Sequence, residues 1–129
     1  MYPDDLLYTE THQWARVEGD IATIGITDYA QDQMGDLVYV ELPEVGVEVT
    51  AGEPAGQVES VKAVSDVQSP VSGEVAEANQ ALVDAPETVN RDPYGDGWMM
   101  KVRISDKSEL NALLNSTAYQ EFLAKEKST

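Results

Sequence analysis

The chain has 129 residues, 42% of them hydrophobic, and this length fits one domain with a modest core. Its formal net charge of −16 argues against binding to nucleic acid or to an anionic membrane surface, because both need clustered Lys and Arg. It has no cysteine, which excludes disulfides, thiolate catalysis and Cys-based zinc sites, and we predict no metal site. There is no run of about 18 apolar residues for a transmembrane helix, and the first residues lack the basic and apolar regions of a signal peptide. We therefore expect a cytoplasmic protein of a prokaryote, with a processed organellar form as the alternative.

Short segments rich in β-branched residues alternate along the chain with turns that contain Gly and Pro. This pattern is typical of a mainly β domain, a small sandwich or flattened barrel. The predicted strands are residues 21–27, 36–42, 47–50, 55–61, 64–69, 74–78 and 98–104. Residues 28–34 predict a short helix, with Asp28 as its N-cap and Gly35 as its end. The stretch 79–97 is rich in Pro and Gly and is predicted to be mostly loop.

The C-terminal part predicts a helical pair over residues 106–114 and 117–125, and its apolar side chains predict packing against the β domain. The two expected capping boxes are Asp106-x-x-Glu109 and Thr117-x-x-Gln120. The aromatic residues expected in the core are Trp14, Tyr39, Trp98 and Phe122. We expect a single domain over residues 1–129, with a β core at about 15–104 and the helices at about 106–125.

Lys62 is the only lysine among the first 100 residues, which carry 20 acidic and three basic residues. It lies between two predicted strands and is therefore expected at the tip of a hairpin. A lysine on a rigid, protruding turn can be recognised and acylated by another enzyme. Taken alone, the turn favours an ordinary solvated lysine, since lysine is among the most exposed residue types. Biotin attachment is disfavoured because Val61 and Ala63 flank the lysine, where biotinyl carriers typically have methionine.

Six ordered blocks between Leu7 and Leu123 carry a resemblance to a known family. The blocks are Thr11-His12-Gln13-Trp14, Gly25-Ile26-Thr27-Asp28-Tyr29-Ala30-Gln31, Gly35-Asp36-Leu37-Val38-Tyr39-Val40-Glu41-Leu42-Pro43, Glu59-Ser60-Val61-Lys62-Ala63, Ser69-Pro70-Val71-Ser72-Gly73-Glu74-Val75 and Asn90-Arg91-Asp92-Pro93-Tyr94-Gly95-Asp96-Gly97-Trp98. In this order and spacing the chain resembles the H protein of the glycine cleavage system. The resemblance implies a lipoyl-domain-like hybrid fold with lipoate in amide linkage to Lys62.

The resemblance also implies a carrier rather than an enzyme. Such a carrier takes the aminomethyl group of glycine from a pyridoxal-phosphate (PLP) glycine decarboxylase on its lipoyl arm and passes it to a tetrahydrofolate-dependent aminomethyltransferase. An FAD dihydrolipoyl dehydrogenase then reoxidises the arm, and a lipoate ligase or lipoyl transferase attaches it. The alternative is a lipoate relay, in which the same scaffold donates lipoyl groups to other acceptor proteins. No nucleophile with its base, metal cluster or phosphate loop in the sequence supports an enzyme.

Two groups of residues are expected to serve the arm. Recognition around the lipoyl lysine is assigned to Glu59, Ser60, Val61 and Ala63. A cleft that shelters the loaded arm is assigned, through the resemblance, to Thr11, His12, Gln13 and Asp66. Gln13 departs from the family, which usually has glutamate at this position. Because an amide can only hydrogen-bond the aminomethyl ammonium, Asp66 is the acid expected to pair with it.

Overall fold

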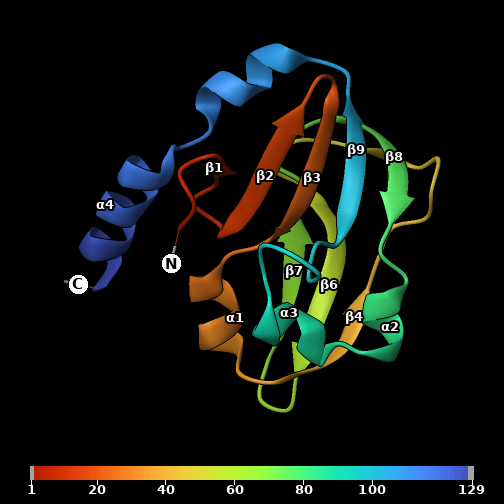
Figure 1. The fold of residues 1–129 in the computed structure, drawn as a ribbon, viewed down its shortest axis with the longest axis vertical. Helices are drawn as coiled ribbons and strands as arrows, with labels where there is room; N and C mark the ends of the chain where they lie inside the picture. The colour runs from red at the N-terminus through yellow and green to blue at the C-terminus, as the bar shows by residue number, and fades with distance from the viewer. Residues whose placement is uncertain (1, 128–129) are drawn as a thin grey trace.

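The computed structural model describes residues 2–127, which form two antiparallel sheets flanked by short helices (Figure 1). The strands are β1 (Leu7–Tyr8), β2 (Gln13–Glu18), β3 (Ile21–Ile26), β4 (Leu37–Glu41), β5 (Glu48–Val49), β6 (Pro54–Ser60), β7 (Val64–Gln68), β8 (Gly73–Ala78) and β9 (Met100–Ile104). One sheet has the order β1-β2-β3-β9-β8-β5 and the other β4-β6-β7. The mainly β prediction is confirmed, with two open sheets in place of a closed barrel.

The main core is built by residues of both sheets, which meet through inward-facing side chains. A second, smaller cluster joins the N-terminal strands to the C-terminal helix and contains Leu6, Tyr8, Trp14, Tyr119 and Leu123. Trp14 is fully buried, as predicted, and its indole Nε1 donates to the Pro93 carbonyl at 3.0 Å. The prediction that Tyr39 belongs to the core is wrong, because its side chain lies on the solvent-facing side of β4 with 45% of its surface exposed.

The short helix α1 (Asp28–Met34) has the predicted bounds but a different N-cap. Thr27 is the cap: its backbone is extended and its Oγ1 accepts from the Ala30 amide at 3.2 Å. Asp28 therefore lies in the first turn, where a carboxylate still complements the helix dipole. Gly35 ends the helix as predicted, with φ of 78° and its amide bonded to the Gln31 carbonyl.

The structure differs from the predicted strands and loops in two places, residues 79–97 and the N-terminal strands. Residues 79–97 contain two short helices, α2 (Ala81–Asp84) and α3 (Glu87–Arg91), in place of a continuous loop. Pro86 immediately precedes α3, where a residue without an N–H suits a helix start. Strands β1 and β2, which were not predicted, extend the large sheet beyond β3.

The C-terminal pair consists of a 3-10 helix, η1 (Lys107–Ala112), followed by α4 (Ser116–Lys127). Asp106 caps η1, its Oδ1 accepting from the Ser108 amide at 3.0 Å, but neither predicted capping box forms in full. The Glu109 carboxylate turns away from its own helix and accepts from the Ser72 amide and hydroxyl at 2.7 and 2.8 Å. Asn115, one residue before α4, caps it by accepting from the Ala118 amide at 2.8 Å.

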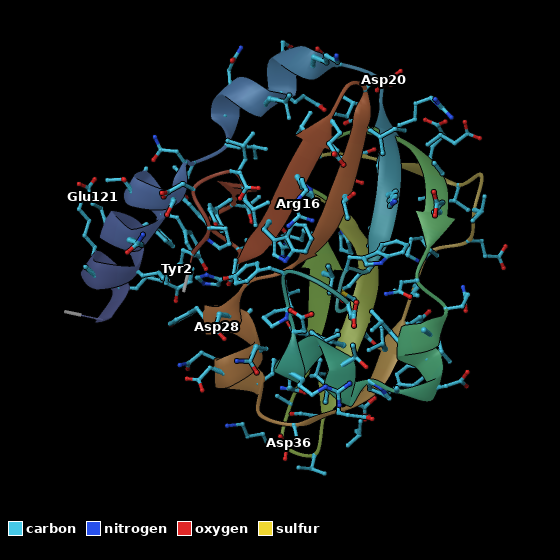
Figure 2. The ribbon with its side chains drawn as sticks, in the orientation of Figure 1. Tyr2, Arg16, Asp20, Asp28, Asp36 and Glu121 are labelled. Atoms are coloured by element: carbon cyan, nitrogen blue, oxygen red, sulfur yellow. The ribbon has the colours of Figure 1, made fainter. Side chains whose placement is uncertain are left out.

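Packing of this segment against the β domain is confirmed. Tyr119 and Leu123 of α4 are buried, and the Tyr8 ring stacks on the Tyr119 ring with centroids 4.8 Å apart. Glu121 points away from the sheets on the opposite side of α4 (Figure 2). Among the described residues 2–127, no helix is long and apolar enough to cross a bilayer.

Candidate functional site at the β6–β7 turn

The turn between β6 and β7 presents Lys62. Glu59 pairs with Val64, and the Ser60 amide donates to the Ala63 carbonyl at 2.8 Å, so the turn proper is Val61 and Lys62. Neither Val61 nor Lys62 has a positive φ. Among the non-glycine residues of the described chain, only His12 has one. The primed turns usual in two-residue hairpins, which need positive φ, are therefore not used here.

Ser60 supplies the missing stabilisation of this turn. Its buried Oγ accepts from the Lys62 amide at 3.3 Å and from the Ala63 amide at 3.2 Å. A serine hydroxyl that bonds backbone groups two and three residues ahead holds a turn without glycine. The backbone of Lys62 is thus fixed by the residue that ends β6.

The Lys62 side chain is exposed and passes over the end of α1. A Cβ atom placed on Gly35 would lie 3.5 Å from the Lys62 Cε, so the glycine provides a floor without a side chain of its own. Within residues 2–127, no carboxylate holds Lys62 in an ion pair. Figure 1 shows the turn protruding at one end of the molecule beyond α1 and α3, and in Figure 2 Asp36 lies at this same end. The amine is therefore open to approach by another protein.

Asn90 on α3 anchors the floor beneath Lys62, a role that the sequence did not reveal. Its Nδ2 donates to the Gly35 carbonyl at 2.9 Å, and its Oδ1 accepts from the Leu37 amide at 2.9 Å. Leu37 in turn pairs with Ser60. The block that contains Asn90 was recognised, but only the fold brings residues 53 and 55 positions apart into contact.

The four residues assigned to recognition surround the lysine with different orientations. Val61 is 89% exposed beside it, and Glu59 is half-buried on the outer face of the small sheet. Ser60 points inward, and Ala63 packs partly against the main core. Only Glu59 and Val61 therefore offer side chains to a partner.

A cavity of about 460 Å³ lies at the far end of β7 from the lysine. Its walls come from the loop between β1 and β2, the turn after β5, the end of β7 and the segment around η1. Of the four residues expected in the arm cleft, Thr11 and Gln13 line this cavity, together with Gln68 and Ser69. His12 and Asp66 do not.

Gln13 is buried, and its amide is engaged by its own loop. Its Oε1 accepts from the hydroxyls of Thr9 and Thr11 at 2.8 and 2.5 Å, and its Nε2 donates to the Thr11 carbonyl at 2.9 Å. Both the oxygen and the nitrogen of the Gln13 side-chain amide are therefore bonded within the loop. Gln13 therefore shapes the cavity wall by holding the loop.

His12 faces the C-terminal helix. Its Nδ1 lies 2.8 Å from the Tyr119 hydroxyl and its Nε2 lies 3.5 Å from a Glu126 carboxylate oxygen. The ring also packs against Tyr29, with centroids 4.7 Å apart. The positive φ of 75° lets the backbone turn Thr11 and Gln13 toward the cavity while His12 points to α4.

Asp66 lies on the outer face of the small sheet, between Lys62 and the cavity. It pairs with Gln57 across the β6–β7 ladder, and its Oδ1 accepts from the Gln57 Nε2 at 3.3 Å. At about 3.3 Å per residue, Asp66 is roughly 13 Å along the strand from Lys62, and the cavity begins two residues further, at Gln68.

Comparison with known proteins decides the family. The family model described as glycine cleavage H-protein matches residues 6–126. The chain belongs to the glycine cleavage H-protein family. It is 64% identical to the glycine cleavage system H protein of Rubrobacter xylanophilus, over 84% of this chain and 86% of that protein. The crystal structure of a glycine cleavage system H protein from Mycobacterium marinum superposes with a TM-score of 0.85 at 41% identity, covering 97% and 98% of the two chains.

Membership in the H-protein family confirms the predicted family, fold and general function. The chain is a lipoyl carrier component of the glycine cleavage system. The similarity also extends to a probable glycine cleavage system H protein of the archaeon Haloarcula marismortui, 58% identical over 92% of this chain and 94% of that one.

Burial of His12 predicts that the stability of the protein depends on pH. Desolvation lowers the pKa of His12, although the Glu126 carboxylate acts in the opposite direction. The unfolded chain, with the ordinary pKa of 6.5, therefore binds the proton first as the pH falls. The stability that neutral His12 contributes is present above that value and is lost as the pH falls toward the folded pKa.

We expect urea denaturation to show a larger loss of unfolding free energy from about pH 7.5 to about pH 5.5 in the native protein than in His12→Asn. Asparagine does not titrate and tolerates a positive φ, so it is a matched control. Equal losses of unfolding free energy in the native protein and in His12→Asn would show that His12 is not the source of this pH dependence.

Proposed function

We propose that the lipoyl group is attached in amide linkage to Lys62 and that the chain shuttles the aminomethyl group of glycine on it. The observation that supports this most directly is the geometry of the turn. Ser60 fixes the lysine backbone, Gly35 leaves the stem unobstructed, and the amine protrudes at one end of the molecule. A carrier needs this combination of a rigid support and a free amine, since tethering raises the effective concentration of the carried group at each enzyme.

When bound, the lipoyl group would supply the sulfur that accepts the aminomethyl group, and the chemistry itself belongs to the partner enzymes. The chain contributes a fixed attachment point. Acylation removes the one positive charge at the turn and makes a chain of formal charge −16 more negative by one unit. The attachment point is then an uncharged amide on an acidic surface.

The partners in this proposal are the PLP-dependent glycine decarboxylase, the tetrahydrofolate-dependent aminomethyltransferase, the FAD dihydrolipoyl dehydrogenase and a lipoate ligase or lipoyl transferase, all met in the cytoplasm. The net charge of −16 supports encounters with basic surfaces on these enzymes. Steering of this kind weakens as salt is raised.

Peptide mass mapping of protein from its native host tests the attachment site. We expect a lipoyl mass increment on Lys62 alone. Lys101 is a useful internal comparison, because it lies 3.9 Å from the Glu77 carboxylate and over the Trp98 ring at 5.2 Å. A lipoyl group on Lys101, Lys107, Lys125 or Lys127 would overturn the proposal.

The resting place of the arm is proposed along β7 toward the cavity. An extended lysine carries its amine about 6 Å from its Cα, and the lipoyl group adds about 8 Å, so the tip reaches roughly 14 Å. This span matches the separation of Lys62 from Asp66 and falls short of the wall at Thr11 and Gln13. Asp66, between Lys62 and the cavity, is thus proposed to pair with the positive charge of the aminomethyl group. His12 is proposed to hold the loop that carries Thr11 and Gln13 in the cavity wall.

An Asp66→Asn variant is expected to lose the carried aminomethyl group up to about five-fold faster, because an exposed ion pair contributes at most roughly 1 kcal/mol. The measurement is formaldehyde release from the loaded protein in the absence of other enzymes. Glu41→Gln is the matched control, since Glu41 lies in the same cross-strand row with Gln57 between the two acids. Equal rates in native protein and Asp66→Asn would show that Asp66 does not guard the arm.

A further inference from the structure

Four exposed apolar side chains lie around Lys62. They are Val38, Tyr39, Val61 and Val64, exposed by 53, 45, 89 and 57%, and we call them the turn patch. The described part of the chain exposes only three other large apolar side chains, Val45, Val47 and Val83. Single exposed apolar residues are normal on a soluble protein, but a group of four at one site is not explained by chance exposure.

A β-bulge creates half of this patch. Leu37 pairs with Ser60 and Tyr39 with Glu59, which leaves Val38 as an extra residue in β4. Regular alternation would bury one of two consecutive residues. Here Leu37 and Val40 are buried and both residues between them are exposed. Bulges often re-aim side chains beside functional sites, and this one turns two apolar side chains outward next to the lysine.

On the outer face of the small sheet, two apolar side chains flank a carboxylate in the row nearest the turn, and two carboxylates flank an amide in the next row. Tyr39, Glu59 and Val64 are in register across the three strands, nearest the turn. The next row is Glu41, Gln57 and Asp66. Side chains in register lie on the same face of a sheet, so the turn patch is bordered by carboxylates.

We propose that the turn patch is the docking surface for the enzyme that acylates Lys62, an inference that rests on the proposed attachment site. The reach of the side chains selects this partner. An enzyme that acts on the tip of a finished arm works roughly 14 Å from the lysine Cα, whereas the enzyme that forms the amide must draw in an amine only about 6 Å away. That enzyme must therefore come closest to Val38, Tyr39 and Val64.

Charge complementarity defines the matching surface. Glu41 and Asp66 border the patch, Glu59 lies within it between Tyr39 and Val64, and Asp36 lies at the same end of the molecule (Figure 2). The partner surface is therefore a shallow apolar depression with Lys and Arg at its rim, next to the channel that admits the amine. Apolar contacts at the centre supply affinity, and the charged rim supplies orientation and association rate.

The test is the lipoylation of purified apo-protein by a lipoate ligase with ATP and lipoate, followed by intact mass. The double variant Tyr39→Thr/Val64→Thr places β-branched threonine, which suits a strand, at both positions and removes apolar contact. We expect its kcat/KM to fall about tenfold, mainly through KM, as for loss of a central interface contact. The control Val45→Thr/Val47→Thr changes exposed valines beside β8 and is expected to stay within about twofold of native. Melting temperatures establish that both variants are folded.

The outcomes separate the two proposals. If native apo-protein is not modified at Lys62, the proposed attachment site fails. If native protein and Tyr39→Thr/Val64→Thr are modified at equal rates, only the docking surface is overturned. A native dimer in sedimentation velocity that the double variant dissociates would also overturn it, since a second copy would then cover the patch. Loss of glycine decarboxylation by fully lipoylated double variant, with lipoylation unchanged, would assign the patch to another enzyme.

Discussion

A Lys62→Arg variant is expected to fold like the native protein and to support no glycine cleavage. Arginine keeps the positive charge and the exposed stem, but its guanidinium does not form the lipoyl amide. The side chain is exposed and has no ion pair among residues 2–127, so the expected change in unfolding free energy is within about 0.5 kcal/mol. The loss of activity therefore reports the attachment site and not the fold.

The measurement is release of carbon dioxide from carboxyl-labelled glycine by the reconstituted enzymes. Lys101→Arg is the matched control, because it makes the same substitution at a lysine that packs over Trp98, and it is expected to retain activity. Turnover by Lys62→Arg above a blank without carrier would refute the carrier role of this residue.

The hairpin that carries Lys62 was predictable because its signals are local. Segments of near-alternating polarity on both sides of the lysine indicated β6 and β7, and the short stretch between them indicated a tight turn. The support beneath the turn was not predictable in this way. The contacts from Asn90 to Gly35 and Leu37 join segments far apart in the sequence, and no periodicity encodes them.

Helix ends and aromatic burial show a second limit of sequence reasoning. Thr27 and Asp28 are adjacent and both suit an N-cap, and the extended backbone of Thr27 decides between them. Glu109 fits a capping box by its spacing, but the Ser72 amide and hydroxyl bind its carboxylate instead. Tyr39 was expected in the core because of its size, and one extra residue in β4 turned it to solvent. In each case a tertiary partner or a single-residue shift overrides a local preference.

The residues assigned to the arm cleft separate in the structure for the same reason. Thr11 and Gln13 lie against the cavity, and His12 and Asp66 do not. The direction of each side chain depends on the positive φ at His12, which the sequence does not signal. Within this one motif, Thr11 and Gln13 therefore face the cavity, and His12 between them faces helix α4.

Removal of residues 106–129 is expected to lower the unfolding free energy by several kcal/mol. The deletion takes away Tyr119 and Leu123, which are buried, and uncovers Leu6 and Tyr8, which are at most 1% exposed in the native protein. A fully buried apolar side chain of this size contributes about 1.5–3 kcal/mol. Against a typical total of about 5–15 kcal/mol, the truncated chain should be marginally stable at best.

A point variant separates helix docking from mere chain shortening. Leu123→Ala keeps the whole chain and is expected to lower the unfolding free energy by about 2–5 kcal/mol, the range for creating a cavity at a buried leucine. Val83→Ala is the control, because Val83 is 46% exposed and its truncation should cost no more than about 0.5 kcal/mol. Urea denaturation at neutral pH measures all three proteins. If Leu123→Ala and Val83→Ala lost equal stability, α4 would not be held against β1 and β2 by its buried face in solution.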